Sequence, residues 1–155
     1  MEADVAQPKA CRLVEASRTR VWEVLADGWT YSQWVVGNSR MRTVAEDWPA
    51  SGAVIEHSIG VWPLVIDDCT ISQECRPPEE LVLLAGLGAF GAARISLRLE
   101  EAPGGCCVEM LEVPVRGLMS VIPNHVALVA VYPRNLECLR RLAALAERRS
   151  PDAIG

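Results

Sequence analysis

The chain has 155 residues, half of them hydrophobic, and a formal net charge of −5 at pH 7. This length allows one core of ordinary size, so we expect a single domain rather than a disordered chain or a tail. The acidic balance offers no positive field that would gather phosphates, which argues against a nucleic-acid partner.

The N-terminal part of the chain predicts one strand and two short helices. Residues 10–16 suit a strand, and the small and polar residues 1–9 before it are typical of a loose end. Ser17 is a suitable N-cap for a helix over residues 18–26, because its hydroxyl can accept from a first-turn amide. Thr30 is predicted to cap a second, shorter helix in the same way. The apolar contacts of that second helix are Tyr31 and Trp34.

After Gly37 the apolar residues alternate with polar ones, which predicts antiparallel strands. Turns rich in proline and glycine recur about every ten residues and separate these strands. The predicted strands cover residues 40–46, 54–61, 65–74, 81–87, 93–100 and 106–115. Residues 40–46 are expected at an edge. Together with the first strand they predict an α+β protein with a seven-stranded antiparallel sheet.

The only long stretch with helical spacing is residues 124–149. Its apolar residues recur at steps of three and four, which places them on one face. This stripe consists of Leu128, Tyr132, Leu136, Leu139, Ala143 and Ala146. Pro133 removes an amide donor inside the helix and predicts a kink or a restart there. Asn135 then has two interpretations, a cap of the restarted helix or a hydrogen-bond partner of a ligand.

A histidine falls on a strand face that the apolar pattern assigns to the interior. His57 shares this face with Ile55 and Ile59, and imidazole titrates near neutral pH. The simpler interpretation is a core histidine bonded to a neighbouring group. A shift in register by one residue would instead place Glu56 and Ser58 inside.

Two carboxylates are candidate acids on predicted inner faces. Asp67 follows a turn, where solvated carboxylates are common, whereas Glu112 lies in the middle of its strand. The apolar neighbours on these two faces are Cys69, Ile71 and Met110. A carboxyl group in an apolar hollow has a raised pKa and can serve as an acid or a base. If His57 and Glu112 both point inward, they form a plausible acid/base pair for dehydration or enolisation.

Metal, cofactor and membrane signals are missing from the sequence. The six cysteines form no C-x-x-C pair and the histidines number two, so no zinc spacing exists. No glycine-rich phosphate loop follows a strand, and we expect neither a metal nor a cofactor. The longest apolar run, residues 81–90, is too short to span a bilayer, and the acidic start has no signal-peptide core. We therefore expect a cytoplasmic protein with reduced thiols in its core.

Five segments carry a likeness to a known group of proteins. They are VEAS at 14–17, VWEVL at 21–25, YSQW at 31–34, the DWP turn at 47–52, and RNLECLRRL at 134–142. With the order of the predicted elements, they resemble the START-like superfamily, the Bet v 1-like or SRPBCC proteins. The bacterial polyketide cyclase/dehydrase-like branch is the part of that superfamily they resemble most. The resemblance covers about residues 10 to 149, which would form a single domain.

The resemblance implies a helix-grip fold, in which the curved sheet wraps around the long C-terminal helix and leaves an apolar cavity between them. Members bind lipids, sterols, polyketides or other hydrophobic molecules, and some catalyse their cyclisation and dehydration. We therefore expect binding or carriage of a small hydrophobic ligand. The alternative is an aromatase/cyclase-like or dehydratase-like enzyme that uses His57 and Glu112, and a third hypothesis is an interaction module that forms a homodimer.

The expected cavity has a wall of twelve residues from the second short helix, three strands and the long helix. These residues are Tyr31, Trp34, Ile55, His57, Ile59, Cys69, Ile71, Met110, Glu112, Leu128, Tyr132 and Asn135. Residues 126–132 of the long helix are predicted to border the cavity or its entrance. Residues 136–146 are predicted to pack on the sheet as core.

Overall fold

The structure is a computed structural model, and it describes residues 9–86, 91–117, 121 and 123–148. These residues form one sheet of seven strands together with helices that pack against it. In chain order the elements are β1 (Ala10–Val14), α1 (Arg18–Ala26), the 3-10 turn η1 (Gly28–Thr30), α2 (Tyr31–Trp34), β2 (Asn38–Val44), β3 (Val54–Val61), β4 (Leu64–Arg76), β5 (Glu80–Gly86), β6 (Ala92–Ala102), β7 (Gly105–Arg116) and α3 (Asn124–Arg148).

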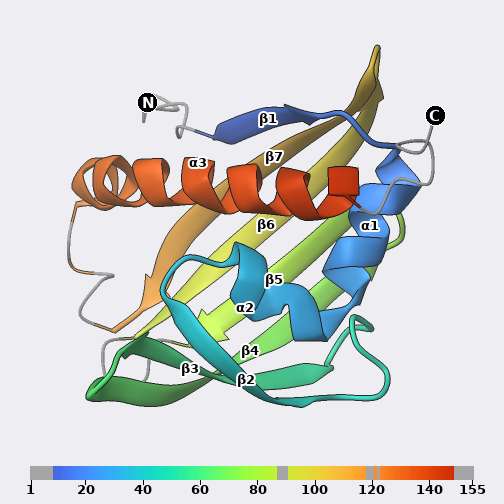
Figure 1. The fold of residues 1–155 in the computed structure, drawn as a ribbon. Helices are drawn as coiled ribbons and strands as arrows, with labels where there is room; N and C mark the ends of the chain where they lie inside the picture. The colour runs from blue at the N-terminus through green and yellow to red at the C-terminus, as the bar shows by residue number, and fades with distance from the viewer. Residues whose placement is uncertain (1–8, 87–90, 118–120, 122, 149–155) are drawn as a thin grey trace.

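The sheet is antiparallel throughout, with the strand order β1-β7-β6-β5-β4-β3-β2. Consecutive strands from β2 to β7 are neighbours, and β1 lies beside β7. Figure 1 shows α3 lying across the concave face of the curved sheet, with α1 and α2 on the same side. This arrangement confirms the predicted α+β helix-grip fold. The edge strands are β1 and β2, and a homodimer formed through an edge strand stays a prediction.

Helix α1 begins as predicted, because the Ser17 hydroxyl accepts a hydrogen bond from the Arg20 amide at 3.2 Å. Its buried residues are Val21, Trp22, Val24 and Leu25. The prediction that Thr30 caps α2 is wrong, since its side chain makes no cap bond. The Thr30 hydroxyl instead lies 2.8 Å from each of the carbonyl oxygens of Val24 and Asp27. The threonine therefore ties the end of α1 to the start of α2.

The inner face of the sheet carries the apolar residues of the alternating strands. On β6, Ile95, Leu97 and Leu99 are buried as predicted, each at most 1% exposed. The neighbouring strands add Leu81, Leu83, Val108 and Met110 to this face. Helix α3 completes the core with Cys138, Leu139, Leu142, Ala143 and Ala146. Because cores of this kind are close-packed, the part of α3 from Cys138 onward is held in one fixed arrangement on the sheet.

Strand β4 buries the face opposite to the predicted one. The sequence pattern assigns Asp67, Cys69 and Ile71 to the interior. The structure buries Asp68, Thr70 and Ser72 instead. The register explains the difference, since Thr70 pairs with Ile55 and Asp68 pairs with His57, and directly paired residues share a face. The apolar neighbours are misleading on this strand because its inner residues are polar.

Helix α3 is continuous over 25 residues and contains Pro133, so the predicted restart is wrong. Proline has a backbone angle that suits a helix, and its missing amide removes one hydrogen bond from a long element. Asn135 is therefore not a cap, and it lies inside the helix with 4% of its surface exposed. Leu136 is 39% exposed, contrary to prediction. Cys138 and Leu142 occupy the inner face in its place.

Some predictions concern residues outside the described part of the chain. The expected loose ends, residues 1–9 and 150–155, lie there apart from Lys9. The Lys9 ammonium is 3.8 Å from a carboxylate oxygen of Glu109 on β7. The side chain of Leu128 is also outside the description. Among the described helices, none has the length and apolar character needed to cross a membrane.

Candidate ligand-binding site

Three polar side chains meet on the inner side of β3 and β4, beneath α2. The hydroxyl oxygens of Tyr31 and Thr70 are 3.1 Å apart, and His57 Nε2 is 2.9 Å from the same Thr70 oxygen. The Tyr31 ring also packs on the His57 ring, with centroids 5.2 Å apart, and edge-on against Trp34 at 5.4 Å. All four side chains are buried. We call Tyr31, Thr70 and His57 the hydroxyl–imidazole group.

Burial controls the protonation of this group. Loss of water around His57, assisted by the Arg42 guanidinium, lowers the pKa of the imidazole to about 4, so it is neutral at neutral pH. Burial raises the pKa of the Tyr31 phenol, which keeps its proton. His57 Nδ1 is buried and has no hydrogen-bond partner among the described residues. The imidazole therefore presents one free nitrogen inside the protein.

A second polar group joins β7 to α3. The Arg134 guanidinium lies 2.7 Å from a Glu112 carboxylate oxygen, and its Nε donates to the carbonyl of Val36 at 3.1 Å. The Asn135 side-chain amide also hydrogen-bonds Glu112. Asn135 Oδ1 is buried and has no partner within the described part of the chain. We call Glu112, Arg134 and Asn135 the carboxylate–guanidinium group.

Opposing influences set the charge of Glu112. Burial raises the pKa of its carboxyl group, while the positive charge of Arg134 and the hydrogen bonds from Arg134 and Asn135 act against that rise. The Glu112 side chain is 10% exposed and the Arg134 side chain 33%. The ion pair therefore matches one negative with one positive charge at the inner face.

The two groups lie close to each other, because the charges of Arg134 and Glu112 both affect the pKa of the Tyr31 phenol. His57 and Glu112 both point inward, as the sequence pattern predicts. They have different partners, however, and no direct bond joins them among the described residues. The predicted acid/base pair is therefore two separate groups with Tyr31 between them.

Most of the expected wall residues lie on the inner side, and some do not. Ile55, Met110 and Trp34 are buried there, and Ile59 and Tyr132 are half-buried. Cys69 and Ile71 pair with the outward-facing Glu56 and Val54, so they lie on the outer face of the sheet, contrary to prediction. Their places belong to Asp68 and Thr70.

Thr70 and Arg134 belong to the site although the sequence pattern does not select them. The sequence pattern misses Thr70 because the residues on either side of it are apolar. Arg134 does carry a signal, since it lies four residues before Cys138 and eight before Leu142, both on the buried face. A charged residue in that row is expected to need a buried partner, which here is Glu112.

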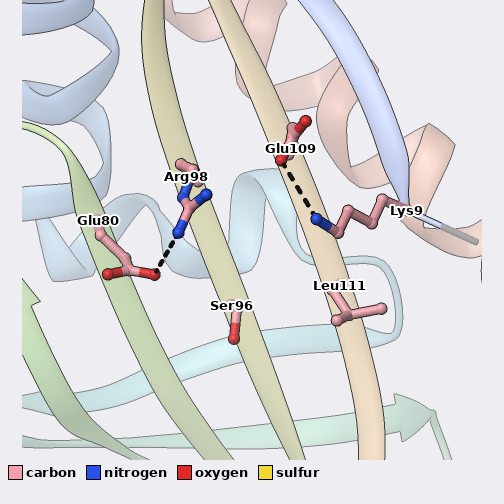
Figure 2. A pocket seen from close by; sticks show the side chains of 6 residues that line it. All are labelled: Lys9, Glu80, Ser96, Arg98, Glu109 and Leu111. Carbon is pink, nitrogen blue, oxygen red and sulfur yellow. Dashed lines mark ion pairs between the residues drawn. The ribbon is translucent and has the colours of Figure 1, made fainter. Parts of the chain in front are cut away.

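A pocket on the opposite side of the sheet is the competing location for a ligand. Figure 2 shows it on the outer face of β5, β6 and β7, where Ser96 and Leu111 lie next to two ion pairs along the strands. Arg98 is 3.9 Å from Glu80, and Lys9 is 3.8 Å from Glu109. Its volume is about 200 Å³, and a hollow of about 460 Å³ on the same face is lined by Gln73, Arg76, Arg94 and other mostly polar side chains. Neither has the mainly apolar lining that is typical of ligand pockets. The charges of the Figure 2 pocket are also satisfied by one another, so the outer face is the weaker candidate.

Metal binding finds no support in the described part of the chain, where no cluster of three or more suitable side chains could hold an ion. The six cysteines are free thiols. Cys106 and Cys138 are buried as predicted, whereas Cys11 is exposed and the others are half-buried. Cys138 accepts a hydrogen bond from the Val36 amide at 3.4 Å, so it is a structural contact of α3.

The neutral His57 predicts a pH-dependent stability. The unfolded chain binds a proton at its imidazole near pH 6.5, and the folded chain does so only near pH 4. Unfolding therefore takes up a proton in this window, and stability falls as the pH falls, by on the order of 2 kcal/mol. Urea unfolding at steps from pH 7 to pH 4 measures this slope.

The His57→Gln variant is the comparison for that measurement, with His125→Gln as the matched control because His125 is exposed. The raised pKa of Glu112 acts in the opposite direction and is common to all three proteins. We expect the slope of the wild type and of His125→Gln to exceed that of His57→Gln. Three parallel slopes would contradict a buried neutral imidazole.

Comparison by sequence identifies no relative: no family model and no curated protein matches the chain. Comparison by structure finds proteins with a similar fold. The chain superposes on protein NE0264 from Nitrosomonas europaea with a TM-score of 0.71 at 12% identity, covering 91% of this chain and 94% of that one. For Ara h 8.0201 the TM-score is 0.69 at 9% identity, and the match covers 92% of this chain and 97% of that one.

A third similar structure is StfQ, a di-domain ARO/CYC from the steffimycin biosynthetic pathway. Its TM-score is 0.70 at 11% identity, and the match covers 92% of this chain and 50% of the di-domain chain. Identities this low establish a common fold and leave activity open. The chain has the helix-grip fold of the START-like, Bet v 1-like proteins.

Proposed function

We propose that this protein binds a small hydrophobic molecule between α3 and the inner face of the sheet, where the hydroxyl–imidazole and carboxylate–guanidinium groups orient it. The observation that carries the proposal is that two buried polar atoms, His57 Nδ1 and Asn135 Oδ1, have no hydrogen-bond partner in the part of the chain that the structure describes. They come from β3 and α3, and the ring of Tyr31 packs on the His57 ring.

Unpartnered atoms of this kind are costly, at about 1–3 kcal/mol each, and native proteins contain few of them. Most of the surrounding inner face is apolar, including Ile55, Leu83 and Met110. A mainly apolar molecule with a few polar groups would give both atoms a hydrogen-bond partner and would cover the apolar surface. The fold shared with StfQ, an ARO/CYC, is consistent with a ligand of that kind.

A second candidate function is proton transfer to or from the bound molecule. The observation that favours it is the neutral His57, whose free Nδ1 would face the ligand and whose Nε2 is held by Thr70. An imidazole fixed in this way is suited to act as a general acid or base. Carriage and catalysis differ in their outcome, since a carrier releases its ligand unchanged.

The test begins with native mass spectrometry of the purified protein, followed by organic extraction of any retained molecule. We expect a bound species of small mass and apolar character. Incubation of the protein with that species separates the two candidates, because a carrier returns it intact and an enzyme converts it. Backbone NMR during titration with 2-naphthol, an apolar probe, then locates the site.

Chemical-shift changes are expected at inner-face residues, with His57, Thr70 and Asn135 among them. The outer pocket of Figure 2 is the internal control, and its reporters are Ser96 and Leu111. Shifts confined to those two residues and their neighbours would move the site to the outer face. The absence of any retained molecule together with no response to 2-naphthol would overturn the proposal.

A further inference from the structure

The number of protons in the hydroxyl–imidazole group limits the directions in which its hydrogen bonds can run. Two bonds join three groups, Tyr31 to Thr70 and Thr70 to His57. The phenol and the threonine hydroxyl each have one proton to donate, and a neutral imidazole has one N–H. No other partner of either hydroxyl is found among the described residues. The direction of the chain therefore follows from counting.

One arrangement uses both hydroxyl protons. Tyr31 donates to Thr70, and Thr70 donates to Nε2 of His57, which leaves the imidazole proton on Nδ1. If Nε2 donated to Thr70 instead, one of the two buried hydroxyls would keep a proton without an acceptor, and Nδ1 would be bare as well. The first arrangement leaves fewer buried groups unpaired and is favoured for that reason. His57 Nδ1 is then a free donor.

Asn135 differs from His57 in that its free atom is a hydrogen-bond acceptor and not a donor. Its amide faces the Glu112 carboxylate, which accepts hydrogen bonds and does not donate them when ionised. The nitrogen of the amide must therefore point at Glu112. The oxygen is then an acceptor that has no partner among the described residues.

No positive charge at the site is left without a partner among the described residues. Glu112 is paired with Arg134 at 2.7 Å, and Arg134 also donates to the carbonyl of Val36. His57 is neutral, and Asp68, which is buried opposite it on β4, accepts a hydrogen bond from the Cys69 amide at 2.9 Å. An anionic ligand group would enter without an opposite charge waiting for it, and desolvation would weigh against it.

We infer that the site selects a neutral ligand with two polar groups of fixed polarity, a carbonyl-type acceptor opposite His57 Nδ1 and a hydroxyl-type or N–H donor opposite Asn135 Oδ1. This inference rests on the proposed binding function. Thr70 is its positioning residue, since it sets the tautomer of His57 without facing the ligand itself. The inference separates neutral molecules of this kind from fatty acids and other carboxylates.

The tautomer of His57 is measured on the free protein by long-range ¹H–¹⁵N NMR, in which a bare and a protonated ring nitrogen have well-separated shifts. The chain has two histidines, so the His125→Gln variant leaves the ring signals of His57 alone. We expect the proton on Nδ1 and a bare Nε2. A proton on Nε2 would overturn the inference whether or not any ligand binds.

Ligand polarity is tested by calorimetry with matched probes on the wild-type protein. 2-Acetylnaphthalene is compared with 2-ethylnaphthalene, and 2-naphthol with 2-methylnaphthalene, so that each pair differs by one hydrogen-bonding group. A net hydrogen bond corresponds to about a fivefold difference in affinity, and we expect both polar probes to bind about that much more tightly. 2-Naphthoate is expected to bind more weakly than 2-acetylnaphthalene.

The Thr70→Val variant connects the two measurements. It should shift the proton of His57 toward Nε2 and reduce the affinity for 2-acetylnaphthalene by several-fold, which is a larger reduction than for 2-naphthol. Equal affinities within each probe pair, or tighter binding of 2-naphthoate, would overturn the inference and leave the binding function standing. If none of the probes binds, the binding function fails and this inference fails with it.

Discussion

Replacing Arg134 with methionine is expected to lower the free energy of unfolding by about 3 kcal/mol. The substitution keeps an unbranched side chain on α3 and removes the positive charge 2.7 Å from Glu112. The Glu112 side chain, 10% exposed, would then be buried without its ion-pair partner. Breaking one half of a buried pair costs more than the pair contributes, because the remaining charge stays desolvated. The one-third exposure of Arg134 places the value at the low end of the usual range.

Two comparisons make this prediction specific. Arg140 lies on the same helix and bonds Glu137 at the surface, with 57% of its side chain exposed, so Arg140→Met should cost well under 1 kcal/mol. Adding Glu112→Gln to Arg134→Met should restore part of the lost stability, since it removes the unpaired charge. Urea unfolding of the four proteins measures both effects. Equal losses at Arg134 and Arg140, or no recovery of stability in the double variant, would contradict a buried ion pair.

Replacing Gly105 with alanine is expected to cost roughly 3–5 kcal/mol, against roughly 1 kcal/mol for Gly104→Ala. Both glycines have a positive φ, 156° and 87°, and they are neighbours in the β6–β7 turn. A Cβ at Gly104 would meet nothing within 4 Å. A Cβ at Gly105 would lie 1.9 Å from the carbonyl oxygen of Val14, at the end of β1.

The reason for the difference is that β1 pairs with β7 across this position, where the two backbones approach each other closely. Room for a methyl group at Gly105 requires β1 to move away from β7. Thermal unfolding monitored by circular dichroism compares the two variants directly. The same melting temperature for both would show that the close approach of β1 contributes nothing to stability.

Much of the fold follows from the sequence because its signals are local. Ser17 predicts the start of α1 through one hydrogen bond to a nearby amide, and the alternation of Ile95, Leu97 and Leu99 predicts the inner face of β6. Each of these depends on a few neighbouring residues and on the presence of a single core. Proline and glycine turns mark the ends of strands in the same local way.

The site is less predictable because its residues are set by pairing across strands. His57 and Glu112 lie among apolar neighbours on their own strands, and their inward direction follows from alternation. Thr70 faces inward because it is opposite Ile55, which the sequence of β4 alone does not reveal. Its partnership with Tyr31 spans 39 positions in the chain and depends on where α2 lies. Polar residues that satisfy one another inside a core resemble surface residues in a sequence pattern.

The uninterrupted passage of α3 through Pro133 has a consequence for local unfolding. Proline has no amide to bond the carbonyl four residues earlier, at Val129, so the two sides of the helix are coupled by one hydrogen bond fewer. The C-terminal side is anchored to the sheet by the Arg134–Glu112 pair and by buried residues from Cys138 onward. On the other side, Val126 and Val129 are 50% and 72% exposed. We expect the first turns of α3 to open at lower free energy than the whole domain, which would give the proposed ligand a route past the helix while the core stays folded.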